Sequence, residues 1–124
     1  MTEGASIEIS LTVEFKSKLR IIAKKYRQIP RDIEEILEQL QAGNFPGDRL
    51  SGVGYAVFKV RVKNSDIKKG KSAGYRLIYW IQSLTNIVLL DIYSKSEQED
   101  IEVKEIQPIL TEFERQSNIE QVAE

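Results

Sequence analysis

The residues of this sequence best suited to chemistry are basic side chains that alternate along one predicted strand. Residues 55–63 read Tyr-Ala-Val-Phe-Lys-Val-Arg-Val-Lys. Because successive strand side chains point to opposite faces, Lys59, Arg61 and Lys63 share one face with Tyr55 and Val57. The other face is apolar and carries Ala56, Phe58, Val60 and Val62. The pattern predicts one face for a core and one for an anion, with an ordinary solvated sheet surface as the alternative reading of the basic face.

Positive charge is concentrated around this strand, although the whole chain is slightly acidic. Residues 59–76 hold one acid, Asp66, and seven bases: Lys59, Arg61, Lys63, Lys68, Lys69, Lys71 and Arg76. That stretch carries about +6, and since the formal net charge of the 124 residues is −1, the remainder sums to about −7. Like charges at alternate strand positions repel one another unless an anion compensates them. The distribution therefore favours a phosphate-bearing polyanion as the partner.

Groups that could move a proton are few, because the sequence contains no histidine and no cysteine. Disulfides and thiolate nucleophiles are excluded, as are the usual His and Cys metal ligands, so any reaction must use Lys, Arg, Tyr, Asp or Glu. Glu97, Glu99 and Asp100 follow Lys95 closely, where their simplest role is to begin a helix. The alternative is that one of them, or Tyr93, is a general base.

Aromatic residues lie close to these bases in the predicted strands. They are Tyr75, Tyr79, Trp80 and Tyr93. They could present stacking surfaces to nucleobases, or they could fill the core, as aromatic side chains in strands commonly do.

Apolar periodicity predicts the elements that must position these groups. Strict alternation favours a strand over residues 6–13, and a four-three spacing of apolar residues favours a helix from residue 14 to Ile29, ending before Pro30. Ser96 and Glu99 fit a capping box that opens the last helix, and Pro108 should either end that helix or restart it. The remaining predicted elements are a helix over residues 31–42 and strands over 55–63, 75–82 and 86–93.

A chain of 124 residues predicts a single domain. We expect its core to span about residues 7–110 and residues 115–124 to form a disordered tail. No stretch approaches the ~18 apolar residues of a membrane-spanning helix, and we expect a cytoplasmic protein.

The element order and three motifs resemble the RelE/ParE superfamily of bacterial toxins from type II toxin-antitoxin systems, and within it the RelE-like branch. The motifs are the basic strand, Gly74-Tyr-Arg76, and residues 90–95, Leu-Asp-Ile-Tyr-Ser-Lys. The resemblance covers residues 7–110. It implies an α+β, RelE-like fold of order β-α-α-β-β-β-α, with an antiparallel-dominated sheet of about four strands. An N-terminal helical hairpin should pack on one face of that sheet, and a helix should close the chain.

The resemblance also implies an activity. RelE-type toxins enter the ribosomal A site and cleave messenger RNA there, by attack of a ribose 2′-OH on the adjacent phosphate, which leaves a 2′,3′-cyclic phosphate and a 5′-OH. The reaction needs no metal and no other cofactor. By position, Lys59 and Arg61 match the family's basic strand, and Arg76 matches the arginine that contacts the scissile phosphate. Tyr93 completes the implied catalytic set, with Glu97 as an alternative acid or base. The implied RNA contacts are Lys63, Lys68, Lys69, Lys71 and Lys95.

The implied partners are the ribosome with its messenger RNA and a cognate antitoxin protein, without a membrane or a small-molecule cofactor. Two other functions remain open on the same fold. One is a ParE-like inhibitor of DNA gyrase. The other is a catalytically inactive domain that only binds RNA or an antitoxin.

Overall fold

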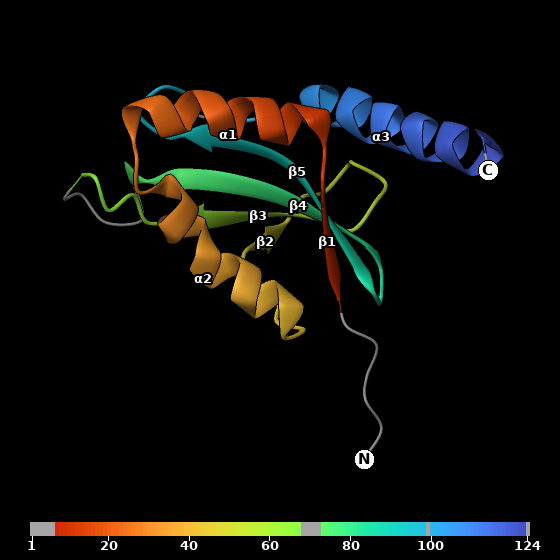
Figure 1. Ribbon diagram of the computed structural model, residues 1–124, viewed down its shortest axis with the longest axis horizontal. Coiled ribbons are helices and arrows are strands. Elements are labelled where there is room, and N and C mark those ends of the chain that lie inside the picture. The colour runs from red at the N-terminus through yellow and green to blue at the C-terminus, as the bar shows by residue number, and fades with distance from the viewer. Residues whose placement is uncertain (1–6, 68–72, 99, 124) are drawn as a thin grey trace, which may run out of the picture.

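The computed structural model describes residues 7–67, 73–98 and 100–123, and for residues 119–123 it describes the backbone alone (Figure 1). The strands are β1 Glu8–Leu11, β2 Asp48–Arg49, β3 Val57–Val62, β4 Tyr75–Ser83 and β5 Asn86–Ser94. The helices are α1 Val13–Lys25, α2 Ile29–Gln41 and α3 Val103–Ala123. None of the helices in this described part has the length and apolar character needed to cross a membrane.

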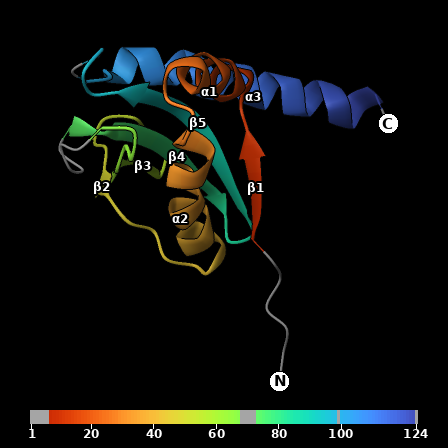
Figure 2. The same cartoon turned by 60° about the vertical axis from the view of Figure 1, so that its left-hand side comes forward.

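The strands form one mixed sheet between two helical layers. Their order is β1-β5-β4-β3-β2, in which β1 runs parallel to β5 and all other neighbours are antiparallel. Helices α1 and α2 pack on one face of the sheet, and α3 packs on the opposite face. In Figure 2, α3 runs behind α1. The α+β class and the order of the main elements are as expected, with β2 as an additional two-residue strand at the edge.

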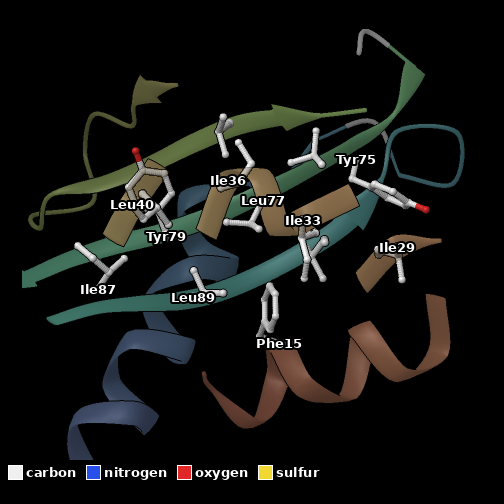
Figure 3. Packing of buried hydrophobic residues seen from close by; sticks show 13 residues of the cluster. Phe15, Ile29, Ile33, Ile36, Leu40, Tyr75, Leu77, Tyr79, Ile87 and Leu89 are labelled. Atoms are coloured by element: carbon white, nitrogen blue, oxygen red, sulfur yellow. The ribbon is translucent and has the colours of Figure 1, made fainter. Parts of the chain in front are cut away.

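The first core lies between the helical hairpin and the sheet. Ile33, Ile36 and Leu40 of α2 face Leu77 and Tyr79 of β4 (Figure 3). Phe15 of α1 and the odd-numbered Ile87 and Leu89 of β5 extend this core towards β1. All of these side chains are at least 93% buried, so burial of one apolar face of each helix holds the hairpin to the sheet.

The second core lies on the opposite face, under α3. Ile106 and Leu110 of α3 pack with Ile78 and Trp80 of β4 and with Val57 of β3. Val57 was expected on the face that binds an anion, and its complete burial corrects that expectation for this end of β3. Both faces of the sheet are therefore buried in part. On the α3 side of this strand, polar side chains occur only from Lys59 onwards.

The junction of β1 and α1 is fixed by Thr12. Its hydroxyl accepts a hydrogen bond from the Phe15 amide and donates one to the Leu90 carbonyl, both at 2.9 Å. An N-cap residue takes an extended conformation, so β1 ends at Leu11 and α1 begins at Val13. Ile29 belongs to α2 and not to the first helix, because Pro30 fits the first turn of a helix, where its missing N–H needs no partner.

Helix α3 corrects the predictions for the C-terminal part of the chain. It begins at Val103, so the Ser96 and Glu99 box does not open it, and Glu99 lies outside the described residues. At its start the Glu102 amide donates instead to the Glu105 carboxylate at 3.3 Å. Pro108 stays inside a continuous helix because buried Ile106 and Leu110 anchor the turns on either side of it.

The helical backbone of α3 also continues to residue 123, where disorder was expected over 115–124. Glu112 accepts hydrogen bonds from the guanidinium of Arg115 and the amide of Gln116, three and four residues further on. Side chains at these spacings lie on neighbouring turns, and their pairing supports the helix.

Gly74 allows β4 to begin beside β3. A Cβ atom at this position would collide with the Val62 carbonyl oxygen and would lie 3.0 Å from the Asn64 amide nitrogen. Its own carbonyl accepts the Lys95 amide at 2.9 Å, so the ends of β3, β4 and β5 meet around it. The glycine of the Gly74-Tyr-Arg76 motif therefore has a packing role.

We expect Gly74→Ala to lower the free energy of unfolding by about 2–3 kcal/mol, because backbone atoms must move to admit the methyl group. Gly54→Ala is the control: Gly54 has a φ of +89° but open space around it, so its cost is the backbone strain of about 1 kcal/mol. Urea denaturation measures both values. An equal or smaller loss at Gly74 would contradict the packing role.

A buried ion pair joins α1 to the edge of β5. The Asp91 carboxylate is 1% exposed, and its Oδ1 lies 2.9 Å from Lys18 Nζ, whose side chain is 32% exposed. Burial raises the pKa of Asp91, and the hydrogen bond and charge of Lys18 oppose that rise. Lys18 thus compensates part of the cost of placing a carboxylate inside the protein.

We expect Lys18→Met to destabilise the protein by about 2–3 kcal/mol, because it leaves the buried carboxylate without its cation. Asp91→Asn should cost less, about 1 kcal/mol, since the amide oxygen can still accept the Ile92 N–H and Lys18 can reach solvent. Lys16→Met, at an exposed position of α1, should change stability by less than about 0.5 kcal/mol. The reverse order of the first two losses would refute this account of the pair.

Candidate phosphate-binding site

Strand register places three of the predicted site residues in one row. Arg61 of β3 pairs with Arg76 of β4, and Arg76 pairs with Tyr93 of β5. Directly paired residues share a face of the sheet, so this row crosses the three strands on the side of α3. Lys59 lies two residues before Arg61 and therefore on the same face.

A β-bulge in β5 puts Tyr93 on this face. Ile78 pairs with Asp91 and Tyr79 pairs with Leu89, so Leu90 is an extra residue with no partner in β4. Before the bulge the odd-numbered Leu89 faces the first core, whereas after it the even-numbered Ile92 does. Without the extra residue Tyr93 would point towards α2 instead of lying beside Arg76.

The centre of the site is a single carboxylate oxygen, Oδ1 of Asp100, in the connection between β5 and α3. Lys59 Nζ lies 2.9 Å from it, the Tyr93 hydroxyl donates to it at 3.2 Å, and the Ile101 amide donates to it at 2.8 Å. The three donors come from β3, β5 and the segment before α3. Together they form an anion-binding cluster, which we call the Lys59–Tyr93–Ile101 cradle.

The charges of the cradle determine which of its groups can give a proton. The hydrogen bond from Lys59, followed by that from the Ile101 amide, holds the pKa of Asp100 below its usual range. Burial first, and then the charge of Asp100, raises the pKa of Tyr93 well above its usual range, and the charge of Arg76 opposes this rise. Tyr93 therefore keeps its proton at neutral pH and acts as a donor, so its phenol is poorly suited to be a base.

The remaining catalytic candidates differ in their exposure. Arg76 is 6% exposed, and its guanidinium donates to the Tyr75 carbonyl at 3.2 Å. Arg61 and Lys63 are exposed at the edge of β3 and line a cavity of about 270 Å³. That cavity is also lined by Asp32 and Glu35 of α2. The basic residues of the strand therefore lie in two places: Arg61 and Lys63 border this cavity, whereas Lys59 lies in the cradle.

The other predicted contacts lie further from the cradle or cannot be placed. Glu97 pairs with Lys25 of α1 at 3.3 Å and not with Lys59. Lys95 directly follows β5, and its backbone amide donates to the Gly74 carbonyl. Lys68, Lys69 and Lys71 lie outside the described residues.

The aromatic residues proposed as stacking surfaces are core residues. Tyr75 and Tyr79 are fully buried, Trp80 is 5% exposed and Tyr93 is 3% exposed. Their rings cannot meet a nucleobase face to face while the cores are intact. The stacking hypothesis is therefore wrong for these four residues.

Two further cavities are lined in part by residues of α1. One, of about 210 Å³, is lined by Tyr93, Ser94, Glu97 and Gln98 together with Lys18, Ile21 and Ile22 of α1. The other, of about 530 Å³, lies between the start of α1 and the middle of α3, away from Lys59. Within the described part of the chain, no three carboxylates come close enough to hold a metal ion.

The part of the site that the sequence did not specify is the position of Asp100. It was grouped with Glu97 and Glu99 as a residue at a helix start, because the last helix was expected to begin there. The available signal was the placement of three acids directly after a strand that ends in Tyr93. Which of the three turns back over the sheet depends on contacts between residues 41 positions apart, such as Lys59 with Asp100.

The sequence matches no protein family model and no curated protein. Among solved structures, the chain is similar to a double arginine-to-alanine mutant of the E. coli toxin RelE in the free state. The TM-score is 0.52 at 15% sequence identity, and the match covers 84% of this chain and 95% of that chain. The chain has a RelE-like fold. At this identity the likeness concerns the fold, and it confirms the RelE-like architecture that the sequence predicted.

Within this RelE-like fold, Asp100 should control the acidity of Tyr93. We expect Asp100→Asn to lower the pKa of Tyr93 relative to wild type, because it removes a neighbouring negative charge that disfavours the phenolate. An NMR titration of the tyrosine ring carbons measures this shift. Glu97→Gln removes an equal charge from the same segment and should leave the pKa of Tyr93 in place. An unchanged pKa in Asp100→Asn would show that the two side chains do not interact in solution.

Proposed function

We propose that this protein is a RelE-type toxin that inhibits translation by cutting messenger RNA in the ribosomal A site. The observation that carries the proposal is the cradle itself: a lysine, a protonated tyrosine and a backbone N–H converge on one anionic oxygen, with Arg76 adjacent to Tyr93 in the sheet. The RelE-like fold supports the same proposal independently.

The proposed reaction is an internal transfer of the phosphodiester. The ribose 2′-oxygen loses its proton and attacks the adjacent phosphorus, the bond from phosphorus to the 5′-oxygen breaks, and that oxygen takes up a proton. The products are a 2′,3′-cyclic phosphate and a 5′-OH, and no water is consumed. Negative charge builds on the non-bridging oxygens, where fixed cations and donors lower the barrier.

Each side chain has a role consistent with its surroundings. Lys59 binds a non-bridging oxygen, and Tyr93, which keeps its proton, donates to the leaving 5′-oxygen. Arg76 stabilises the phosphate charge after neighbouring side chains shift, since only 6% of its surface is exposed. Arg61, Lys63 and Lys95 hold flanking phosphates. Glu97 borders the cavity beside Tyr93, and in this proposal its carboxylate accepts the 2′-OH proton.

The proposal includes two kinds of partner. The substrate is messenger RNA on the ribosome, whose phosphates suit the cations of residues 59–76. The second partner is a cognate antitoxin. An acidic, partly disordered segment that folds on binding would match the basic surface and cover it.

We expect Lys59→Gln to reduce messenger RNA cleavage by about 100-fold, the loss typical when one donor to a transition-state oxyanion is removed. Asp100, its partner, is 61% exposed and can be solvated, so the variant should fold. Lys104→Gln makes the same charge change at a side chain that is 78% exposed, and it should retain full activity. Primer extension on a reporter messenger RNA, with and without ribosomes, measures the cuts.

Cuts that need ribosomes and disappear only in Lys59→Gln would support the proposal. No cuts by the folded wild-type protein under either condition would refute it. In that case accumulation of cleavage complexes by purified DNA gyrase would support the ParE-like alternative, and its absence would leave a domain that only binds.

A further inference from the structure

The cradle is already occupied by an anion that belongs to the chain. Three donors converge on Asp100 Oδ1 at 2.8 to 3.2 Å, the arrangement that a non-bridging phosphate oxygen also prefers. Two of the donors, Lys59 and Tyr93, are held on strands of the sheet. Asp100 lies in the connection between β5 and α3 and is the more exposed member of the pair, at 61% against 26% for Lys59.

We propose that the Asp100 carboxylate occupies the binding position of a substrate phosphate and is an internal competitor that an RNA phosphodiester displaces. The cradle is then a phosphate subsite, closed in the free protein by the chain itself. The identity of the ligand rests on the proposed function, whereas the occupation of the subsite rests on the geometry of the donors.

The energies allow this exchange. The Asp100 side chain is 61% exposed and can be solvated by water, so its ion pair with Lys59 can be displaced at small cost. The arriving phosphate brings an equal charge to Lys59 and new oxygens for Tyr93 and the Ile101 amide. The displaced Asp100 carboxylate would be solvated by water, and its negative charge would lie further from that of the incoming phosphate.

A role for Asp100 as the general base fits the site less well. Its lowered pKa makes the carboxylate a weak proton acceptor. Its Oδ1, the oxygen that lies in the cradle, also already receives three hydrogen bonds. A helix cap alone would explain the bond from the Ile101 amide but not the convergence of Lys59 and Tyr93 from two different strands.

The test is binding of a 2′-deoxy oligonucleotide, which cannot be cleaved, measured by fluorescence anisotropy. We expect Asp100→Asn to bind about fivefold tighter than wild type, the effect of removing a competing pair of about 1 kcal/mol. Glu102→Gln makes the same net charge change in the same segment, at a side chain that is 67% exposed, and should bind within twofold of wild type. Equal affinity gains in both variants, or unchanged or weaker binding in Asp100→Asn, would overturn the inference.

A second measurement separates this inference from the proposed function. Inorganic phosphate is titrated into wild type and Asp100→Asn, and the chemical shift of the Ile101 amide reports occupation of the cradle. We expect half-saturation at about fivefold lower phosphate in Asp100→Asn. This result in a protein that neither binds nor cleaves RNA would uphold the subsite and refute the proposed substrate. The same phosphate affinity in both proteins would overturn the inference even if wild type cleaves RNA.

Discussion

The extra residue at Leu90 is the constraint on which the site depends. Strands β4 and β5 form the centre of the sheet, and side chains from both enter both cores. A regular ladder would let β5 keep one alternation from Ile87 to Tyr93. The bulge changes that alternation after Leu89, so that Ile92 stays in the first core while Tyr93 joins Arg76 on the face of α3. Thr12 donates to the Leu90 carbonyl, which ties the start of α1 to the same irregularity.

The late start of α3 is the second feature on which the site depends. Because the helix begins at Val103 and not near Ser96, the connecting segment can turn back over the sheet and place Asp100 beside Lys59. This carboxylate compensates one of the alternating cations whose repulsion pointed to a bound anion. In the free protein, the Asp100 carboxylate thus supplies the negative charge that Lys59 requires. The internal carboxylate and a phosphate are therefore alternatives for one position.

The architecture was predictable from the sequence to a large extent, because it follows from periodicity. Alternation in β1 and β3, apolar stripes in the helices and the apolar run of β5 identified the main elements. The bulge at Leu90 was not predictable, since Val88, Leu89 and Leu90 are equally suited to either face. The end of α1 was misplaced because Ile29 continues the spacing of the first helix, and only the position of Pro30 within the next helix decides between them. The pairing of Asp100 with Lys59 was not predictable, because the two residues are 41 positions apart in the sequence.

The basic strand combines two roles that its pattern does not separate. β2 pairs only with Phe58 and Lys59, so in the described part of the sheet the outer edge of β3 is open from Val60 onwards. Exposed cations on an edge strand prevent pairing with other chains, and this alone would account for Arg61 and Lys63. It does not account for Lys59, which lies where β2 covers the edge and is directed to Asp100 and Tyr93. Lys59 is therefore the residue of the strand whose position is explained by anion binding and not by protection of the edge.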